Sequence, residues 1–235
     1  MKKNILVLGS NGFIGNSLLK KTSDNYICVD KSYKSIKKQN NHYYIRCDIS
    51  SSKDCDKLVE ILEENNLIID AIVNLVGINK IKNFYNISEE IWDQTFNINV
   101  KSLLFLLKKI YPLFSDVVSI VNVASQNGVV AHEDRIDYGA SKAALIHLTK
   151  NLSIDFLKDK SKDIKVNCIS PSYIINKSNK HFFESYAGKK LINKIPYKKL
   201  VEVDDVVNTI MFLLSNESKA IRGQNIILDY GYTIV

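Results

Sequence analysis

The sequence predicts a three-layer α/β/α protein with a doubly wound, mostly or fully parallel sheet of about seven strands. Short apolar runs alternate with helical patterns along the chain, which is the order that parallel sheets with right-handed crossovers require. Several of these runs, including IVNVA, AIVNL and IILD, are almost continuously apolar, as expected for strands covered on both faces. The length of 235 residues suits one α/β domain, so we expect a single domain over residues 1–235.

In the first half of the chain, apolar runs bounded by polar residues or glycine predict four strands, at Ile5–Leu8, Tyr26–Asp30, His42–Cys47 and Ile69–Asn74. Helical spacing predicts two helices between them, at Phe13–Lys21 and Lys53–Glu64. In the second helix, Leu58, Ile61 and Leu62 fall on one face, which predicts that this face packs against the sheet.

In the second half, the same patterns predict strands at Val117–Val123, Ile164–Ile169 and Asn225–Asp229, and helices at 88–111, Asp137–Leu157 and Asp204–Ser215. Ser88 is a good N-cap for the first helix, because its hydroxyl can accept a hydrogen bond from a free N–H of the first turn. The polar, Lys- and Asn-rich segment 172–196 has no clear assignment, and we interpret it as a substrate lid.

Composition excludes several functional classes. The net charge is +7, but only three of the 32 basic residues are arginines, so we interpret the charge as a solvated surface and expect no nucleic-acid partner. The four cysteines lack the spacing of a zinc site, and we expect no metal and a reducing, cytoplasmic location. No apolar run has the length of a signal peptide or a membrane span, so we expect no membrane association.

A glycine-rich loop joins the first predicted strand to the first helix. It reads Gly9-Ser10-Asn11-Gly12-Phe13-Ile14-Gly15, and this spacing lets a bare backbone approach a pyrophosphate at the start of a helix. Asp30 ends the next strand, where a carboxylate can accept hydrogen bonds from the adenosine ribose and repel a 2′-phosphate. These features predict a Rossmann-type fold that favours NAD(H); Lys31 and Lys34 nearby leave NADP(H) open.

A second constellation points to proton transfer. Tyr138 and Lys142 are four residues apart in a predicted helix and therefore share a face, and Ser125 follows the fifth strand. With the glycine loop, this set resembles the short-chain dehydrogenase/reductase family, over essentially the whole chain. The chain is similar to the classical type, although its G-x-x-G-x-x-G loop is typical of extended members.

The resemblance implies a catalytic tetrad of Asn99, Ser125, Tyr138 and Lys142. Tyr138 would be the acid/base, with Lys142 and the nicotinamide expected to lower its pKa. Ser125 would donate to the substrate oxygen, and Asn99 would order a water linking Lys142 to solvent. The expected cofactor contacts, besides the glycine loop, Asp30, Tyr138 and Lys142, are Asp48, Ile49, Asn74, Val76, Gly77, Pro171, Ser172 and Ile174.

The resulting hypothesis is an NAD(H)-dependent oxidoreductase that interconverts a secondary alcohol and a ketone, assembled as a homodimer or homotetramer. The substrate is a small molecule that the sequence leaves unnamed; a sugar, a nucleotide sugar and an acyl-thioester ketone are all compatible. His132 and Arg135, between Ser125 and Tyr138, and the lysines of the lid are compatible with an anionic substrate or with a solvated surface. A non-catalytic nucleotide-binding regulator and a nucleotide-sugar epimerase or dehydratase stay as alternatives.

Overall fold

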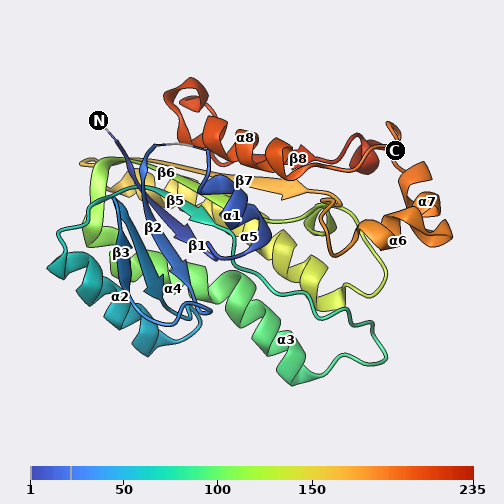
Figure 1. The fold of residues 1–235 in the computed structure, drawn as a ribbon, viewed down its shortest axis with the longest axis horizontal. Helices are drawn as coiled ribbons and strands as arrows, with labels where there is room; N and C mark the ends of the chain where they lie inside the picture. Colours follow the sequence, from blue (N-terminus) through green and yellow to red (C-terminus); the bar gives the residue numbers. More distant parts are fainter. Residues whose placement is uncertain (1, 22) are drawn as a thin grey trace.

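The computed structural model describes residues 2–21 and 23–235, and within them eight strands form one sheet. Their order across the sheet is β3-β4-β2-β1-β5-β6-β7-β8 (Figure 1). The strands are β1 (Asn4–Leu8), β2 (Asn25–Asp30), β3 (Lys37–Gln39), β4 (His42–Arg46), β5 (Ile69–Asn74), β6 (Phe114–Val123), β7 (Asp163–Pro171) and β8 (Asn225–Leu228). All neighbours pair in parallel except β3, which is antiparallel to β4. The mostly parallel, doubly wound sheet predicted from the sequence is confirmed, with one strand more than expected.

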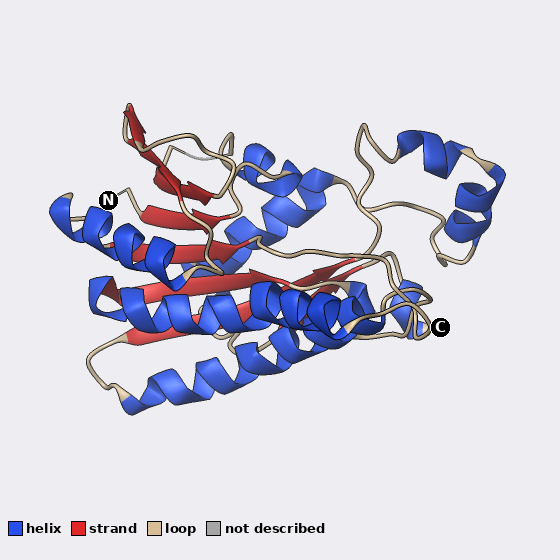
Figure 2. Ribbon diagram, turned by 90° about the horizontal axis from the view of Figure 1, so that it is seen from below, coloured by secondary structure: helices blue, strands red, loops and turns tan. Residues whose placement is uncertain are grey.

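The helices lie on both faces of the sheet, giving the three predicted layers (Figure 2). They are α1 (Phe13–Leu18), α2 (Ser52–Glu64), α3 (Glu89–Phe96), α4 (Ser102–Ile110), α5 (Ile136–Asp155), α6 (Lys180–Glu184), α7 (Tyr186–Asn193) and α8 (Val203–Leu214). The Ser88 hydroxyl accepts a hydrogen bond from the Ile91 N–H at 3.4 Å, so Ser88 caps α3 as predicted. Among the described residues, no helix combines the length and the apolarity that a membrane crossing requires.

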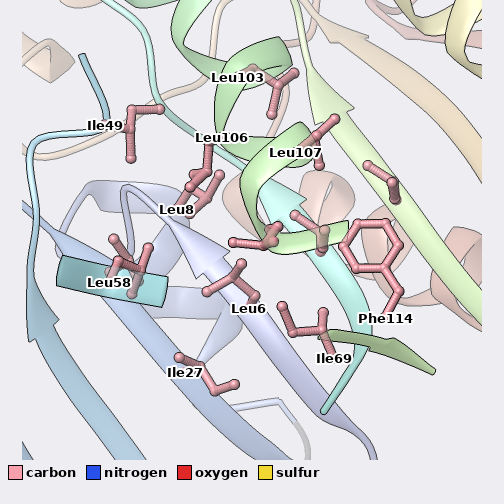
Figure 3. Close-up of a cluster of buried hydrophobic side chains, with 14 of the residues drawn as sticks. Leu6, Leu8, Ile27, Ile49, Leu58, Ile69, Leu103, Leu106, Leu107 and Phe114 are labelled. Atoms are coloured by element: carbon pink, nitrogen blue, oxygen red, sulfur yellow. The ribbon is translucent and has the colours of Figure 1, made fainter. Parts of the chain in front are cut away.

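Two hydrophobic clusters hold the layers together, one on each face. On one face α2, α4 and α5 cover the sheet, and side chains such as Leu58 and Leu106 pack on Leu6 and Ile27 of the strands (Figure 3). On the other face α1 and α8 pack against the alternate residues of the same strands. Because successive side chains of a strand point to opposite faces, a strand buried on both sides must be apolar throughout, which explains the runs seen in the sequence.

Three local features depart from the predicted elements. The helix expected over 88–111 is interrupted by a π-helical turn at Asn97–Lys101, between α3 and α4. Strand β3 was not predicted, and its three residues are all exposed. The segment 172–196, left without elements above, contains α6 and α7, which stand away from the three layers next to the sheet end where β8 ends (Figure 2).

The order of the strands determines where a ligand can bind. The chain leaves β1 toward β2 on one side and later returns to place β5 on the other side of β1. The loops that follow β1 and β5 therefore diverge, and a crevice opens between them at the carboxyl ends of the strands. The glycine loop after β1 and the turn after β5 line this crevice, so the fold brings the two predicted cofactor segments together.

Candidate active site

The glycine loop is shaped by two positions that only glycine fits. Gly9 has a φ of +78°, and its N–H donates to the Val29 carbonyl at 2.8 Å, which turns the chain sharply after β1. A Cβ on Gly15 would lie 2.3 Å from the Ser10 carbonyl oxygen, so α1 can approach the loop this closely only without a side chain there. The loop therefore presents bare backbone at the start of α1, as the sequence predicted.

A first cleft of about 220 Å³ extends from the glycine loop to the ends of β2 and β4. Asp30 and Asp48 both line it. Asp30 accepts hydrogen bonds from the Asn11 N–H at 3.1 Å and from the Ser32 hydroxyl at 2.6 Å, which fixes the carboxylate at the rim. Partial burial of Asp48 raises its pKa, but hydrogen bonds from Ser50 and the charges of Lys31 and Arg46 together outweigh this effect. The net pKa is lowered, so Asp48 is ionised at neutral pH.

A second cleft of about 230 Å³ contains Ser125, Tyr138 and Lys142 together. The two clefts are neighbours, because Leu75, Gly77 and Ile78, from the turn after β5, line both. The tetrad residues predicted from the sequence come from three different elements, yet the fold places three of them around one space next to the glycine-loop cleft.

Gly77 lies in the turn after β5, next to the buried side chains of Lys142 and Asn99. A Cβ on this glycine would lie 3.0 Å from Lys142 Nζ and 3.4 Å from Asn99 Oδ1. Asn99 is buried in the π-helical turn, where its Oδ1 accepts from the Ile78 N–H at 2.8 Å and its Nδ2 donates to the Ile78 carbonyl at 3.0 Å. Its side chain therefore clamps the turn after β5, a role that the sequence did not predict.

Two further glycines bring the Ser125 loop against α5. A Cβ on Gly128 would lie 2.7 Å from the Lys142 carbonyl carbon, and one on Gly139 would lie 2.9 Å from the Asn127 carbonyl oxygen. In both places the obstacle would be backbone, which cannot move aside as the end of a side chain can. These contacts set how closely Ser125 approaches Tyr138 and Lys142.

Lys142 is an ammonium group held in an apolar interior. The side chain is only 4% exposed, and its Nζ donates to the Val123 carbonyl at 2.9 Å. Burial lowers the pKa of Lys142 to about 8, because the charged form loses its hydration. Near neutral pH this lysine is still protonated, but it loses its proton more readily than an ordinary lysine.

In the structure, Lys142 does not lower the pKa of Tyr138 as we predicted. Burial raises the pKa of Tyr138, and only a hydrogen bond with Ser125 and the charge of Arg135 act in the opposite direction. Lys142 Nζ lies 5.7 Å from the centre of the Tyr138 ring and directs a hydrogen bond to Val123 instead. In this arrangement Tyr138 is a protonated phenol at neutral pH.

The structure divides the predicted cofactor residues into two groups. Those that line one of the two clefts are Gly9, Gly12, Ile14, Asp30, Asp48, Ile49, Val76, Gly77, Tyr138, Lys142, Pro171, Ser172 and Ile174. Those that line neither are Ser10, Asn11, Phe13, Gly15 and Asn74. Ser10 and Asn74 are buried and support the loops, since the Asn74 Oδ1 accepts from the Val76 N–H at 3.2 Å and the Ser10 hydroxyl bonds the Val29 carbonyl.

Some residues that the structure places at the site were not predicted from the sequence. Ile78 lines both clefts, and its only signal was its place directly after Gly77. Tyr173 is the second residue of the lid, and its hydroxyl shares a 2.8 Å hydrogen bond with His132 Nε2. This contact joins the loop after Ser125 to the base of the lid, and nothing in the spacing of the two residues reveals it.

The site has the features that a dinucleotide needs. The glycine loop offers backbone that can approach a phosphate, Asp30 stands at the rim, and Gly77 keeps the space beside Lys142 free of a side chain. Across residues 2–21 and 23–235, no group of three or more His, Cys, Asp or Glu side chains is placed to hold a metal ion. All four cysteines are buried free thiols.

The chain is similar in sequence to known oxidoreductases. Residues 24–233 match a family model described as enoyl-(acyl carrier protein) reductase. The chain is 30% identical over 193 residues to an NAD-dependent glycerol dehydrogenase of Listeria innocua, covering 81% of this chain and 74% of that protein. It is 28% identical to an acetoacetyl-CoA reductase of Shinella zoogloeoides, with complete coverage of both.

A solved structure shows the same fold. The short chain dehydrogenase from Leptospira borgpetersenii with bound NAD⁺ superimposes with a TM-score of 0.87 at 28% identity, over 99% of this chain and 93% of that one. The family model covers most of the chain, and the eight-stranded sheet agrees with the fold of that solved relative. The chain therefore belongs to the short-chain dehydrogenase/reductase family of NAD(P)(H)-dependent oxidoreductases.

Proposed function

We propose that the protein is an NAD(H)-dependent oxidoreductase that interconverts a secondary alcohol and a ketone, with Tyr138 as the acid/base. The observation that carries the proposal is the second cleft, where Ser125, Tyr138 and Lys142 line one space beside the glycine loop. A structural role for these three polar residues would not require them to face the same opening. Their grouping in a cleft is what proton transfer to a bound substrate needs.

The cofactor would lie along both clefts, with its pyrophosphate at the glycine loop and its adenosine between Asp30 and Asp48. Asp30 would hold the ribose hydroxyls and disfavour a 2′-phosphate, which supports NAD(H); the exposed Lys31 in the same cleft is the feature that would tolerate NADP(H). When bound, the nicotinamide supplies or accepts the hydride. Lys142 would hold the nicotinamide ribose through the donors that it does not use on Val123.

Each side chain of the tetrad has a distinct task in this proposal. Tyr138 donates its phenolic proton to the ketone oxygen, and burial suits this task because it keeps the phenol protonated at neutral pH. Ser125 donates a hydrogen bond to the same oxygen and holds it in place. Asn99 positions Ile78 and the turn after β5, and in our proposal its turn also orders the water that connects Lys142 to solvent.

The comparisons favour a reaction of this class over the alternatives. The three similar proteins named above are dehydrogenases or reductases, so neither a non-catalytic regulator nor an epimerase or dehydratase gains support from them. Their substrates, as named, are glycerol for one and an acetoacetyl thioester for another. We therefore propose a small hydroxy or oxo compound, a sugar, a nucleotide sugar or an acyl thioester as the substrate class.

Residues 1–235 would act as one domain, with 172–196 as the lid over the second cleft. Ser172 and Ile174 line that cleft, which supports this role for the first part of the segment. We further propose a cytoplasmic homodimer or homotetramer; the buried, unpaired state of all four cysteines fits a reducing compartment.

The proposed reaction is tested by incubating the purified protein with NADH and a panel of ketones, including nucleotide-sugar and acyl-thioester ketones, and with NAD⁺ and the matching alcohols. We expect one substrate to consume one NADH for each alcohol formed. NADH that binds but is not consumed across the panel would support the regulator. Product formed while the bound cofactor is conserved would support the epimerase or dehydratase.

A further inference from the structure

A serine of α5 that the proposed reaction does not use links the acid/base to a neighbouring helix. Ser141 lies three residues after Tyr138 and directly before Lys142, and it is fully buried. Its hydroxyl donates to the Tyr138 carbonyl at 2.8 Å and accepts from Asn99 Nδ2 at 2.9 Å. The Ser141 hydroxyl therefore acts as donor and acceptor at the same time, toward α5 itself and toward the π-helical turn that carries Asn99.

The Asn99 amide connects Ser141 to the turn after β5. An amide group has two N–H donors, and Asn99 Nδ2 donates both to Ser141 Oγ and to the Ile78 carbonyl at 3.0 Å. Its Oδ1 accepts from the Ile78 N–H at 2.8 Å. Ser141 therefore supplies one of the three hydrogen bonds that fix the orientation of the Asn99 side chain.

Both ends of this series of hydrogen bonds lie at the second cleft. Ile78 and Tyr138 line that cleft, and a Cβ on Gly77, directly before Ile78, would lie 3.0 Å from Lys142 Nζ. In a regular α-helix the Tyr138 carbonyl also accepts from the Lys142 N–H, because the two residues are four apart. The Ser141 hydroxyl is thus bonded to the helical turn that carries both the proposed acid/base and Lys142.

A second hydroxyl of α5 has the same hydrogen bonds in a different place. Serine and threonine inside helices often bond back to a carbonyl of the preceding turn for local reasons alone. Thr149 is fully buried, and its Oγ1 donates to the Leu145 carbonyl at 2.9 Å and accepts from Asn122 Nδ2 at 2.9 Å. Neither Thr149 nor Asn122 lines either cleft, so Thr149 is a matched reference for Ser141 away from the site.

We propose that Ser141 is a positioning residue, which holds the Asn99 amide in the orientation that clamps Ile78 and so sets the turn after β5 against Tyr138 and Lys142. The hydroxyl acts through Asn99. Its loss would leave a buried Asn99 N–H without an acceptor, so the amide would gain other orientations. Because reacting groups tolerate little misplacement, turnover should fall before cofactor binding does. This inference rests on the proposed function, because it names a residue that supports the geometry of that reaction.

The first test compares Ser141→Ala with Thr149→Val, which removes a buried hydroxyl of the same helix and likewise leaves an asparagine N–H without its acceptor. For both variants we measure kcat, the dissociation constant for NADH and unfolding in urea. We expect both to lose stability and to keep NADH affinity near the wild-type value, while kcat falls roughly 10- to 100-fold in Ser141→Ala alone. Equal falls of kcat in the two variants, or a wild-type kcat in Ser141→Ala, would overturn the proposal.

A double-mutant cycle tests whether Ser141 acts through Asn99. Asn99→Ala already removes the amide that Ser141 holds, so Asn99→Ala/Ser141→Ala should have nearly the same kcat as Asn99→Ala alone. If the fall of kcat in the double variant instead equals the product of the two single falls, the two residues act independently and Ser141 does not position Asn99.

Amide hydrogen exchange separates this proposal from the proposed function, because it requires no substrate. The Ile78 N–H donates to Asn99 Oδ1, so its exchange rate, measured by NMR, reports on the clamp directly. We expect this N–H to exchange roughly 5- to 10-fold faster in Ser141→Ala than in the wild type or in Thr149→Val. That result supports the positioning role even if no compound of the panel is turned over. An unchanged rate in Ser141→Ala rejects it even if the oxidoreductase activity is established.

Discussion

Asp30 is the side chain that we expect to select the cofactor. Its replacement by alanine should reduce the preference for NADH over NADPH, because it removes both the acceptors for the ribose hydroxyls and the negative charge that repels a 2′-phosphate. We expect the ratio of the two kcat/KM values to fall roughly 10- to 100-fold.

Ser32→Ala is the control for Asp30→Ala. The Ser32 hydroxyl donates to Asp30 Oδ1 at 2.6 Å, so this variant removes a local hydrogen bond of the carboxylate and leaves its charge. It should retain the preference for NADH. If Asp30→Ala keeps the wild-type ratio while it folds normally, the carboxylate does not select the cofactor.

Burial of the Lys142 ammonium destabilises the folded protein. A pKa lowered from 10.5 to about 8 corresponds to roughly 3 kcal/mol of unfavourable free energy for the buried ammonium. Lys142→Met removes this cost but leaves the Val123 carbonyl without its donor. We expect the free energy of unfolding at pH 7, measured in urea, to rise by roughly 1–2 kcal/mol while activity is lost. Lys150→Met, at an exposed position of the same helix, should change neither the free energy of unfolding nor the activity strongly.

The same group gives a pH dependence of known sign. Between pH 8 and 10.5 the unfolded chain binds a proton at Lys142 that the folded chain has released, so folding becomes more favourable as the pH rises through this window. The stability advantage of Lys142→Met over the wild type should therefore shrink from pH 7 toward pH 10. A difference that stays constant over this range would show that the ammonium is not destabilised by burial.

At the scale of elements, we expect the close backbone contacts at Gly15 to control cofactor binding and those at Gly128 to control turnover. Gly15→Ala would push a Cβ against the Ser10 carbonyl and open the glycine loop, so we expect NADH affinity to fall at least about tenfold. Gly128→Ala would push the Ser125 loop away from α5, so we expect kcat to fall at least about tenfold while NADH affinity stays near the wild-type value.

The two glycine variants should each lose about 1–3 kcal/mol of stability, as overpacked sites do. Val129→Ala, at an exposed position next to Gly128, is the control and should retain both the NADH affinity and the kcat of the wild type. Equal losses of NADH affinity in Gly15→Ala and Gly128→Ala would show that the two glycines do not serve different parts of the site.

The sequence predicted the longer elements that bury apolar side chains and failed for the short ones. The strands β1, β2 and β5 were predicted to within one residue, because a strand covered on both sides is apolar throughout. Strand β3 has the sequence Lys37-Lys38-Gln39 and is exposed, so no hydrophobic pattern predicts it. The lid helices α6 and α7 have only five and eight residues, and helical periodicity needs longer segments to be recognised.

The grouping of Ser125, Tyr138 and Lys142 at one cleft could be predicted from residue types and spacing, but the contacts between segments could not. Tyr138 and Lys142 share a helix, so their relation follows from helical geometry alone. The hydrogen bonds of Asn99 to Ile78 and of His132 to Tyr173 join residues 21 and 41 positions apart. The π-helical turn around Asn99 also has no sequence signal that we used, and the raised pKa of Tyr138 depends on packing that only the folded chain shows.

At the scale of the whole molecule, the doubly wound topology explains why residues from distant segments converge. The order of the strands opens a crevice beside β1, and loops after β1, β5, β6 and β7 all end at that edge of the sheet. The two neighbouring clefts are therefore consequences of the fold.

The surface of α3 and α4 is where we expect a second copy to bind. Phe105 is 49% exposed, and a groove lined by residues of α3, the π-helical turn and α4 lies beside it. Exposed apolar surface of this kind is typical of an interface. Phe105→Glu should shift a dimer or tetramer toward the monomer, as measured by light scattering, whereas Phe182→Glu in the lid should not. A wild-type protein that is monomeric at micromolar concentration would contradict this expectation.

In the proposed reaction, Tyr138 transfers the proton while the rest of the site binds the cofactor. The most direct measurement is the turnover of Tyr138→Phe on an established substrate, together with its dissociation constant for NADH. We predict that NADH affinity stays near the wild-type value and that kcat falls roughly 100- to 10 000-fold, the usual contribution of a positioned acid/base. Turnover at the wild-type rate by Tyr138→Phe would show that Tyr138 is not the acid/base.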